Sequence, residues 1–179
     1  MISLGLGLIF VGLTALMLLP RKNSAAASPS PSTPRTIPVA VNYEAPSLTL
    51  SSLDGNEYSL EDYRGQVVLV NLWATWCPPC KAEMPTLDAF YQEHSDEGFM
   101  LIAINDGDKE EDINTFVENY GLSFQVWVDT EHKASIHAFK TQSLPSSFVI
   151  DREGVIRLRW VGEIEKDTME EYVTPLLKQ

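Results

Sequence analysis

Cysteine and histidine are both scarce in this chain of 179 residues. The sequence contains only two cysteines, Cys77 and Cys80, and three histidines, His94, His132 and His137. Two thiolates cannot complete a four-ligand zinc site, and no histidine pair accompanies them at the spacing of a zinc finger. The sequence therefore predicts no metal site, and we interpret the scattered histidines as surface or structural residues.

Positive charge is also scarce. Thirteen Lys and Arg residues stand against 25 Asp and Glu residues, so the formal net charge is −12. Every acidic residue lies at Glu44 or later in the chain. Proteins bind nucleic acid largely by neutralising phosphates with cationic side chains. The charge therefore excludes a nucleic-acid partner, and the sequence also indicates no bound cofactor.

A long apolar run occurs only once, from Ile2 to Leu19. At about 1.5 Å per residue it spans roughly 27 Å, which is just enough to cross the hydrocarbon core of a bilayer. We interpret residues 1–22 as an N-terminal membrane anchor. The alternative is a secretory signal, because Ala25-Ala26-Ala27 fits the small-residue cleavage pattern and would release a secreted form. Arg21 and Lys22 follow the run, so the positive-inside rule leaves the topology ambiguous.

The remaining chain divides by composition. Residues 23–46 are rich in Ser, Ala and Pro and lack periodicity, which is typical of a linker. Residues 47–179 carry strand-like and helix-like patterns that alternate and then finish on a hairpin, which predicts a mixed sheet flanked by helices. We expect strands or hairpins at 47–59, 66–73, 99–105, 124–129, 147–151 and 155–161, and helices at 79–95, 109–120, 133–139 and 165–177.

The chemistry of the chain centres on Trp76-Cys77-Pro78-Pro79-Cys80. A near-continuous apolar strand precedes this stretch, and a helical pattern follows it. Two thiols at this spacing can close a disulfide within one helical turn and exchange two electrons with another thiol pair. We assign Cys77, at the helix cap, as the attacking thiol and Cys80, inside the first turn, as the resolving thiol.

The two prolines suggest the direction of electron flow. Pro78 and Pro79 have no N–H groups, so two amides that could stabilise a Cys77 thiolate are absent. A less stabilised thiolate favours a reductant, because a stabilised reduced form is what makes a strong oxidant. A pKa of Cys77 below about 5 would contradict this hypothesis.

These residues resemble the thioredoxin superfamily. The resemblance rests on Val70 to Cys80, on the helix proline Pro85, and on Leu144-Pro145 before a strand, and it covers about residues 42–178. It is closest to the membrane-anchored, extracytoplasmic TlpA/ResA/CcmG branch of thiol–disulfide oxidoreductases. This branch implies an α/β thioredoxin fold with an N-terminal hairpin extension and a central βα insertion. It also implies disulfide reduction outside the cytoplasm, often of apocytochrome c, with electrons from a membrane thiol carrier.

The resemblance also implies roles for particular residues. Pro145 matches the family's cis-proline, so the Leu144–Pro145 bond is expected to be cis, an uncommon state. Substrate contacts are expected at Trp76, Pro78, Leu144 and Pro145. Glu83 matches an acidic residue of ResA-like members and would move protons for the thiols, although acidic residues also favour helix N-termini for electrostatic reasons.

One position departs from thioredoxin itself, which has a buried aspartate six residues before the first cysteine. Asn71 stands there instead and cannot accept a proton, although it does match the anchored branch. The departure leaves Glu83 as the nearest acid–base candidate.

Three alternatives remain open from sequence. An oxidase or isomerase of the same fold would introduce or rearrange disulfides, and only a measured potential separates it from a reductase. A peroxidase needs a threonine two or three positions before a lone cysteine; Thr75 fits, but the second cysteine at the helix start argues against it. A non-catalytic module would hold apoprotein clients without forming a mixed disulfide.

Overall fold

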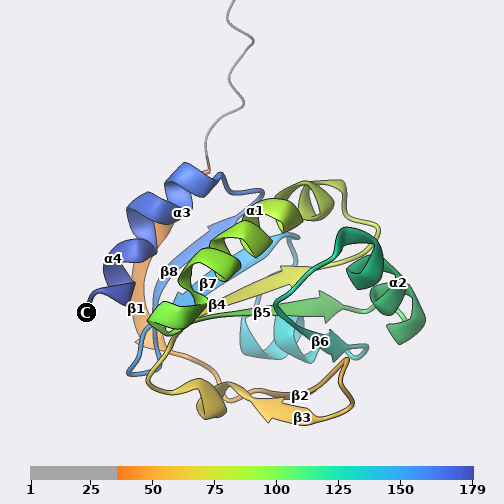
Figure 1. Ribbon diagram of the computed structural model, residues 1–179. Helices are drawn as coiled ribbons and strands as arrows, with labels where there is room; N and C mark the ends of the chain where they lie inside the picture. Colours follow the sequence, from red (N-terminus) through yellow and green to blue (C-terminus); the bar gives the residue numbers. More distant parts are fainter. Residues whose placement is uncertain (1–35) are drawn as a thin grey trace, which may run out of the picture. The chain divides into compact units, whose positions relative to one another are not determined.

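The computed structural model describes residues 36–179. They contain an eight-stranded mixed sheet whose strand order is β1-β8-β7-β4-β5-β6-β2-β3 (Figure 1). The parallel pairs β4–β5 and β5–β6 lie at the centre, and the other pairs are antiparallel. The strands are β1 (Val39–Glu44), β2 (Thr49–Ser52), β3 (Glu57–Ser59), β4 (Val67–Trp73), β5 (Phe99–Asp106), β6 (Gln125–Asp129), β7 (Ser146–Ile150) and β8 (Val155–Val161).

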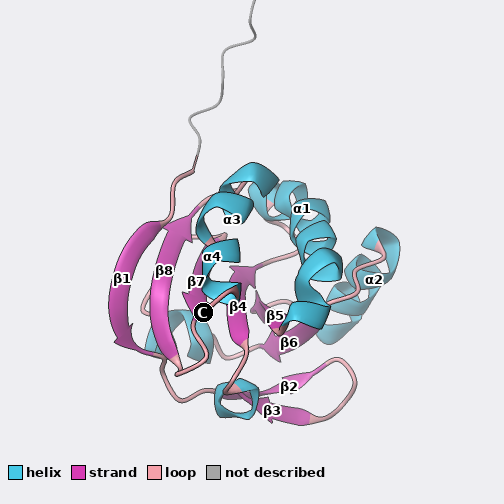
Figure 2. Cartoon of the chain, turned by 60° about the vertical axis from the view of Figure 1, so that its left-hand side comes forward, coloured by secondary structure: helices cyan, strands magenta, loops and turns pink. Residues whose placement is uncertain are grey.

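The α-helices cover one face of the sheet. These are α1 (Pro78–His94), α2 (Glu110–Tyr120), α3 (Lys166–Tyr172) and α4 (Thr174–Leu177). Figure 2 shows α1 and α3 side by side over the strands. Their apolar side chains, including Met84, Leu87 and Phe90 of α1, pack with Leu69 and Leu101 in one core cluster. Burial of these side chains stabilises the fold, because hydrophobic burial is the dominant favourable term in folding.

The other face carries a second core cluster beneath shorter elements. These are the 3₁₀ turn η2 (Leu60–Tyr63) and the π-helical turn η4 (Lys133–Ala138). Side chains of β4 alternate between the two clusters, with Leu69 in one and Val68 and Val70 in the other. All seven residues of β4 are buried, so this strand is covered on both faces as its apolar run predicts.

Most of the predicted elements are confirmed. The hairpin around Asp54-Gly55 forms as β2 and β3, and it extends the sheet beyond β6 as an antiparallel addition. The segment between β5 and β7 supplies α2, β6 and η4, which form the predicted βα insertion. Helix α2 ends at Gly121, whose φ of 62° suits the left-handed cap. The mixed α/β sheet expected from the sequence is therefore present.

Two predicted boundaries differ from the structure. The stretch assigned to the linker contains β1, which pairs with β8 along the sheet edge, so the sheet begins earlier in the chain than predicted. The single closing helix predicted at 165–177 is divided into α3 and α4 at Val173. Pro175 has no N–H and sits in the first turn of α4, where the missing donor is tolerated.

The proposed anchor at residues 1–22 and most of the proposed linker lie outside the described residues. Among residues 36–179, no helix has both the length and the apolar character needed to cross a membrane.

Candidate active site

The candidate active site forms where β4 passes into α1. After Trp73 the chain turns, and Cys77 becomes the N-cap of α1 with extended backbone angles (φ −87°, ψ 108°). Pro78 and Pro79 occupy the first two helical positions, where a proline loses no intrahelical hydrogen bond. This local sequence therefore starts the helix immediately after Cys77, as the spacing predicts.

Cys77 and Cys80 form a disulfide with an S–S distance of 2.05 Å and a Cα–Cα distance of 5.3 Å. The predicted pairing within one helical turn is confirmed. Cys80 is fully buried, whereas Cys77 is 3 % exposed. Both cysteines are therefore buried, although an attacking thiol is expected to be exposed and a resolving thiol shielded. The reason is that both half-cystines pack into the core cluster beneath α1.

One backbone amide faces the sulfur of Cys77. The N–H of Cys80 donates to the Cys77 Sγ at 3.3 Å. Since Pro78 and Pro79 have no N–H, this is the first amide of the helix able to do so. Donors are therefore few around the Cys77 sulfur, and the N-cap hydrogen bond of α1 is donated by the backbone of Cys80.

The Leu144–Pro145 bond is cis, as predicted. In the antiparallel register of β4 and β7, Leu72 lies opposite Ser146, which places Pro145 beside the end of β4. The carbonyl of Pro145 accepts a hydrogen bond from the Gly162 N–H at 2.9 Å. Leu144 packs against both core clusters. The loop that bears Pro145 is thus held at the same end of β4 as the disulfide, while its contact with substrate stays a prediction.

Two further residues predicted at the surface of the site are solvent-exposed. Trp76 is 66 % exposed, and Pro78 is exposed beside it. A large aromatic side chain that remains exposed next to a buried disulfide is free to contact a partner protein. The predicted contacts of Trp76 and Pro78 with substrate remain predictions.

Glu83 is fully buried beneath the disulfide-bearing turn, on the next turn of α1. The Asn71 side-chain amide donates to Glu83 Oε1 at 2.8 Å and to the Ser147 hydroxyl at 3.0 Å. Burial raises the pKa of Glu83 to about 8, and the hydrogen bond from Asn71 opposes this effect. Asn71 stands where thioredoxin has an aspartate. It thus contacts Glu83, the residue that the sequence indicates as the acid–base group in place of that aspartate.

Sequence reasoning missed Asp108. Its carboxylate accepts hydrogen bonds from the Thr75 N–H at 2.6 Å and from the Asn105 side-chain amide at 2.9 Å. Asp108 therefore fixes the turn that carries Trp76 to the edge of the site. A signal was present, because Asn105 lies near the carboxyl end of β5, which is parallel to β4, and the carboxyl ends of parallel strands share one edge of a sheet.

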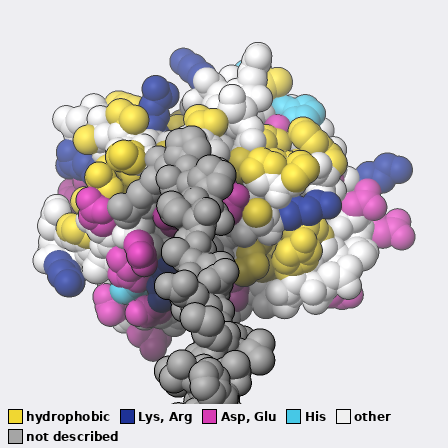
Figure 3. Space-filling model, turned by 90° about the horizontal axis from the view of Figure 1, so that it is seen from above, with side chains coloured by type: hydrophobic (Ala, Val, Ile, Leu, Met, Phe, Trp, Pro, Cys, Tyr) yellow, Lys and Arg dark blue, Asp and Glu magenta, His cyan; other side chains and the backbone are white. Residues whose placement is uncertain are grey.

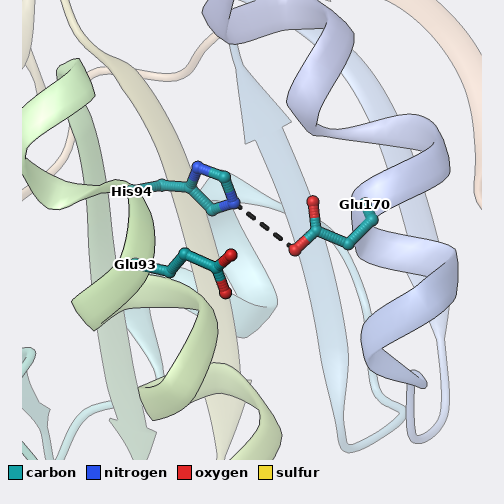
Figure 4. Close-up of side chains that lie close together, drawn as sticks. All are labelled: Glu93, His94 and Glu170. Atoms are coloured by element: carbon teal, nitrogen blue, oxygen red, sulfur yellow. Dashed lines mark hydrogen bonds and ion pairs between the residues drawn. The ribbon is translucent and has the colours of Figure 1, made fainter.

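His94 lies away from the disulfide, near the C-terminal end of α1. Potential ligand atoms of Glu93, His94 and Glu170 lie within 4.8 Å of one another (Figure 4). His94 is buried, and its Nε2 lies 3.4 Å from Glu170 of α3. The Glu93 carboxylate is paired with the Lys166 ammonium at 2.5 Å. We interpret His94 as a structural residue that links α1 to α3, and the absence of a metal site stays a prediction.

Comparison with known proteins agrees with this geometry. The AhpC/TSA family matches residues 41–159, and the chain belongs to this family. The thiol–disulfide oxidoreductase ResA of Geobacillus thermodenitrificans is 34 % identical over 135 residues, which are 75 % of this chain and 77 % of the relative. The thioredoxin-like protein YneN of Bacillus subtilis is 36 % identical over 132 residues, which are 72 % of this chain and 75 % of the relative.

A solved structure also resembles this chain. The thioredoxin-family thiol:disulfide interchange protein of Chlorobium tepidum superposes with a TM-score of 0.67 at 26 % identity, covering 78 % of this chain and 99 % of the other. The fold, the paired cysteines and the relatives together define a thioredoxin-like thiol–disulfide oxidoreductase. Within that class the chain is similar to the ResA proteins.

Proposed function

We propose that the protein reduces disulfides of proteins outside the cytoplasm by dithiol exchange through Cys77 and Cys80. The observation that carries the proposal is the position of this disulfide, at the start of α1 and at the same end of β4 as cis Pro145. Trp76, Pro78, Leu144 and Pro145 would form the surface on which the client disulfide docks.

The exchange balances in two steps. In the reduced protein the Cys77 thiolate attacks one sulfur of the client disulfide, and the other client sulfur leaves as a thiolate that takes up a proton. Cys80 then loses its proton and attacks the Cys77 sulfur of the mixed disulfide. The client is released as a dithiol, and the Cys77–Cys80 disulfide remains, as in the present structure.

Glu83 is proposed to exchange protons with the thiols during these steps. It lies three residues after Cys80, so the two side chains share one side of α1. Its pKa of about 8 permits both proton uptake and proton release near neutral pH. The amide of Asn71 keeps the carboxyl oriented through the 2.8 Å hydrogen bond.

Reduction is favoured over oxidation because few donors face the Cys77 sulfur. Only the Cys80 amide donates to it among the hydrogen bonds of residues 36–179. A thiolate with limited stabilisation gives a more reducing dithiol. Residues 1–22 are proposed to anchor the protein to the membrane, and electrons would come from a membrane thiol carrier. Apocytochrome c is a candidate client, and a cleaved, secreted form is the alternative to the anchored one.

Trapping of the mixed disulfide tests the proposal. Cys80→Ser in the full-length chain leaves Cys77 unable to be resolved, so a disulfide-linked client should accumulate and be identified by mass spectrometry after non-reducing purification. The matched control is Cys77→Ser, which should trap far less. Equal client recovery with both variants would instead indicate a non-catalytic holder.

The reduction potential of the Cys77–Cys80 disulfide tests the direction of electron flow. We expect a value near the −270 mV of thioredoxin, measured against glutathione or dithiothreitol buffers. A value near the −120 mV of DsbA would overturn the reductase assignment and favour the oxidase.

A further inference from the structure

A groove opens beside the loop that bears cis Pro145, on the opposite face of the sheet from α1. It has a volume of about 530 Å³ and lies between the first residues described, the ends of β7 and β8, and the loop before Leu144. This volume is within the range of about 300–1,000 Å³ that is common for ligand sites. Its walls include Ile37, Val39, Lys140, Phe148, Arg159 and Val161.

The groove begins next to the proposed docking surface. Ser146 lines it and directly follows Pro145. Val161 lies opposite Ser146 in the register of β7 and β8, and the next residue, Gly162, donates its N–H to the Pro145 carbonyl. A polypeptide that docks against Pro145 therefore needs only to continue past this hydrogen bond to enter the groove.

The apolar part of the groove is exposed rather than packed. Ile37 is 60 % exposed, Val39 is 56 % exposed and Val161 is 58 % exposed, and all three line the same hollow. Figure 3 views the end of the domain at which the described chain begins and shows hydrophobic side chains gathered in patches, with Lys and Arg side chains nearby. Exposed apolar side chains that cluster in a hollow indicate a binding surface.

The charged part of the groove is positive in a chain whose net charge is −12. Lys140 and Arg159 both line it and are exposed. Within residues 36–179 the structure gives neither cation a carboxylate partner, whereas Arg157, two residues before Arg159 on β8, pairs with Asp151. The Lys140 backbone has a φ of 51°, a left-handed conformation that is uncommon for a non-glycine residue. Two unpaired cations beside apolar walls suit an acidic group flanked by apolar side chains.

We infer that this groove binds an extended segment of the client protein, next to the client disulfide, that carries an acidic side chain flanked by large apolar side chains. The inference rests on the proposed reduction of protein disulfides and names the class of client sequence that is preferred. Lys140 and Arg159 contact the acidic side chain, and Ile37, Val39 and Val161 contact its apolar neighbours. The groove contributes to recognition, not to the sulfur exchange.

Reduction of matched peptides tests the inference. Two disulfide-linked peptides of the same length carry, beside one cysteine, either Leu-Glu-Phe or Leu-Gln-Phe. The reduced full-length protein is mixed with each, and the second-order rate constant is measured by stopped flow. We expect the Glu peptide to react about three- to tenfold faster at low salt, because two exposed ion pairs have modest energies. High salt should remove this advantage by screening the charges.

Variants assign the effect to the groove. K140Q/R159Q should bring the ratio of the two rate constants close to one. K133Q/K178Q removes the same charge from exposed lysines outside the groove and should keep the wild-type ratio. If both double variants show the same ratio of rate constants, or if the wild type reduces the Glu and Gln peptides at the same rate, the inference is wrong.

Two further measurements distinguish failure of the proposed function from a different occupant of the groove. Failure of the wild type to reduce even a small aromatic disulfide would contradict the proposed function itself, independently of the groove. If deletion of residues 1–35 creates a Glu preference that the full-length chain lacks, the chain's own N-terminal segment is the occupant, and the client inference is wrong.

Discussion

Glu83→Gln should change how the stability of the oxidised protein depends on pH. Burial raises the pKa of Glu83 from 4.5 to about 8. Below pH 4.5 the folded and unfolded chains both hold the proton, so this residue costs the folded state nothing. As the pH rises toward 8 the unfolded chain releases the proton while the folded chain keeps it, and stability falls. The loss is complete once the pH passes the folded-state pKa.

The magnitude follows from the separation of the two pKa values. At roughly 1.4 kcal/mol per pH unit, the folded state loses on the order of 4 kcal/mol between pH 5 and pH 8 through this residue. Glutamine does not titrate, and its side-chain oxygen can still accept the hydrogen bond that Asn71 donates to Glu83. The free energy of unfolding of Glu83→Gln should therefore exceed that of the wild type by an amount that grows across this interval.

Urea unfolding of the oxidised proteins at pH 5, 6, 7 and 8 provides the measurement. Glu118→Gln, at an exposed position of α2, serves as the control and should follow the wild-type profile. If the difference between Glu83→Gln and the wild type stays constant from pH 5 to pH 8, the argument from burial is refuted.

Substitutions at three other positions test the site and the structure around it. Asp108→Ala removes the acceptor for the Thr75 N–H and should destabilise the protein by about 1–3 kcal/mol in urea unfolding, whereas Asp108→Asn keeps an acceptor and should cost less; equal losses would contradict the assigned contact. Trp76→Ala should change the free energy of unfolding by less than about 0.5 kcal/mol because the side chain is exposed, yet slow insulin reduction; unchanged insulin reduction would argue against a substrate contact. Gly121→Ala should lower the free energy of unfolding by about 1–2 kcal/mol, because the backbone φ of 62° is unfavourable for alanine. A Cβ there meets nothing within 4 Å, so no steric clash adds to this cost, and a neutral result in thermal unfolding would contradict the argument.

The centre of the sheet was predictable because its strands have a simple signal. The apolar run that forms β4 is buried on both faces, and Asp54-Gly55 gives a local turn that closes β2 onto β3. Strand β1 had no such signal. Its residues are mostly exposed and lie among prolines and small residues, and its pairing depends on β8, more than a hundred residues later in the chain. Contacts of that range cannot be read from local composition.

In the candidate site, too, the features with a local sequence signal were predictable, and those that depend on long-range packing were not. Cys77 and Cys80 were predictable because their chemistry depends on a fixed local spacing, and cis Pro145 followed from the family resemblance. The contact between Asn71 and Glu83 depends on how α1 packs on β4, which the sequence does not state. Asp108 was missed because one carboxylate in a strongly acidic chain does not stand out until the fold brings it to the Thr75 amide.

The position of β4 has a consequence for the durability of the redox site. Three strands lie beyond it on one side and four on the other, so neither margin of the sheet reaches it directly. Local opening is easiest at margins and termini, and interior strands open only with the whole domain. Amide hydrogens of β4 should therefore exchange with deuterium more slowly than those of β1 and β3. Fraying at the borders would leave the spacing between the sulfurs and the proline loop intact through repeated rounds of turnover.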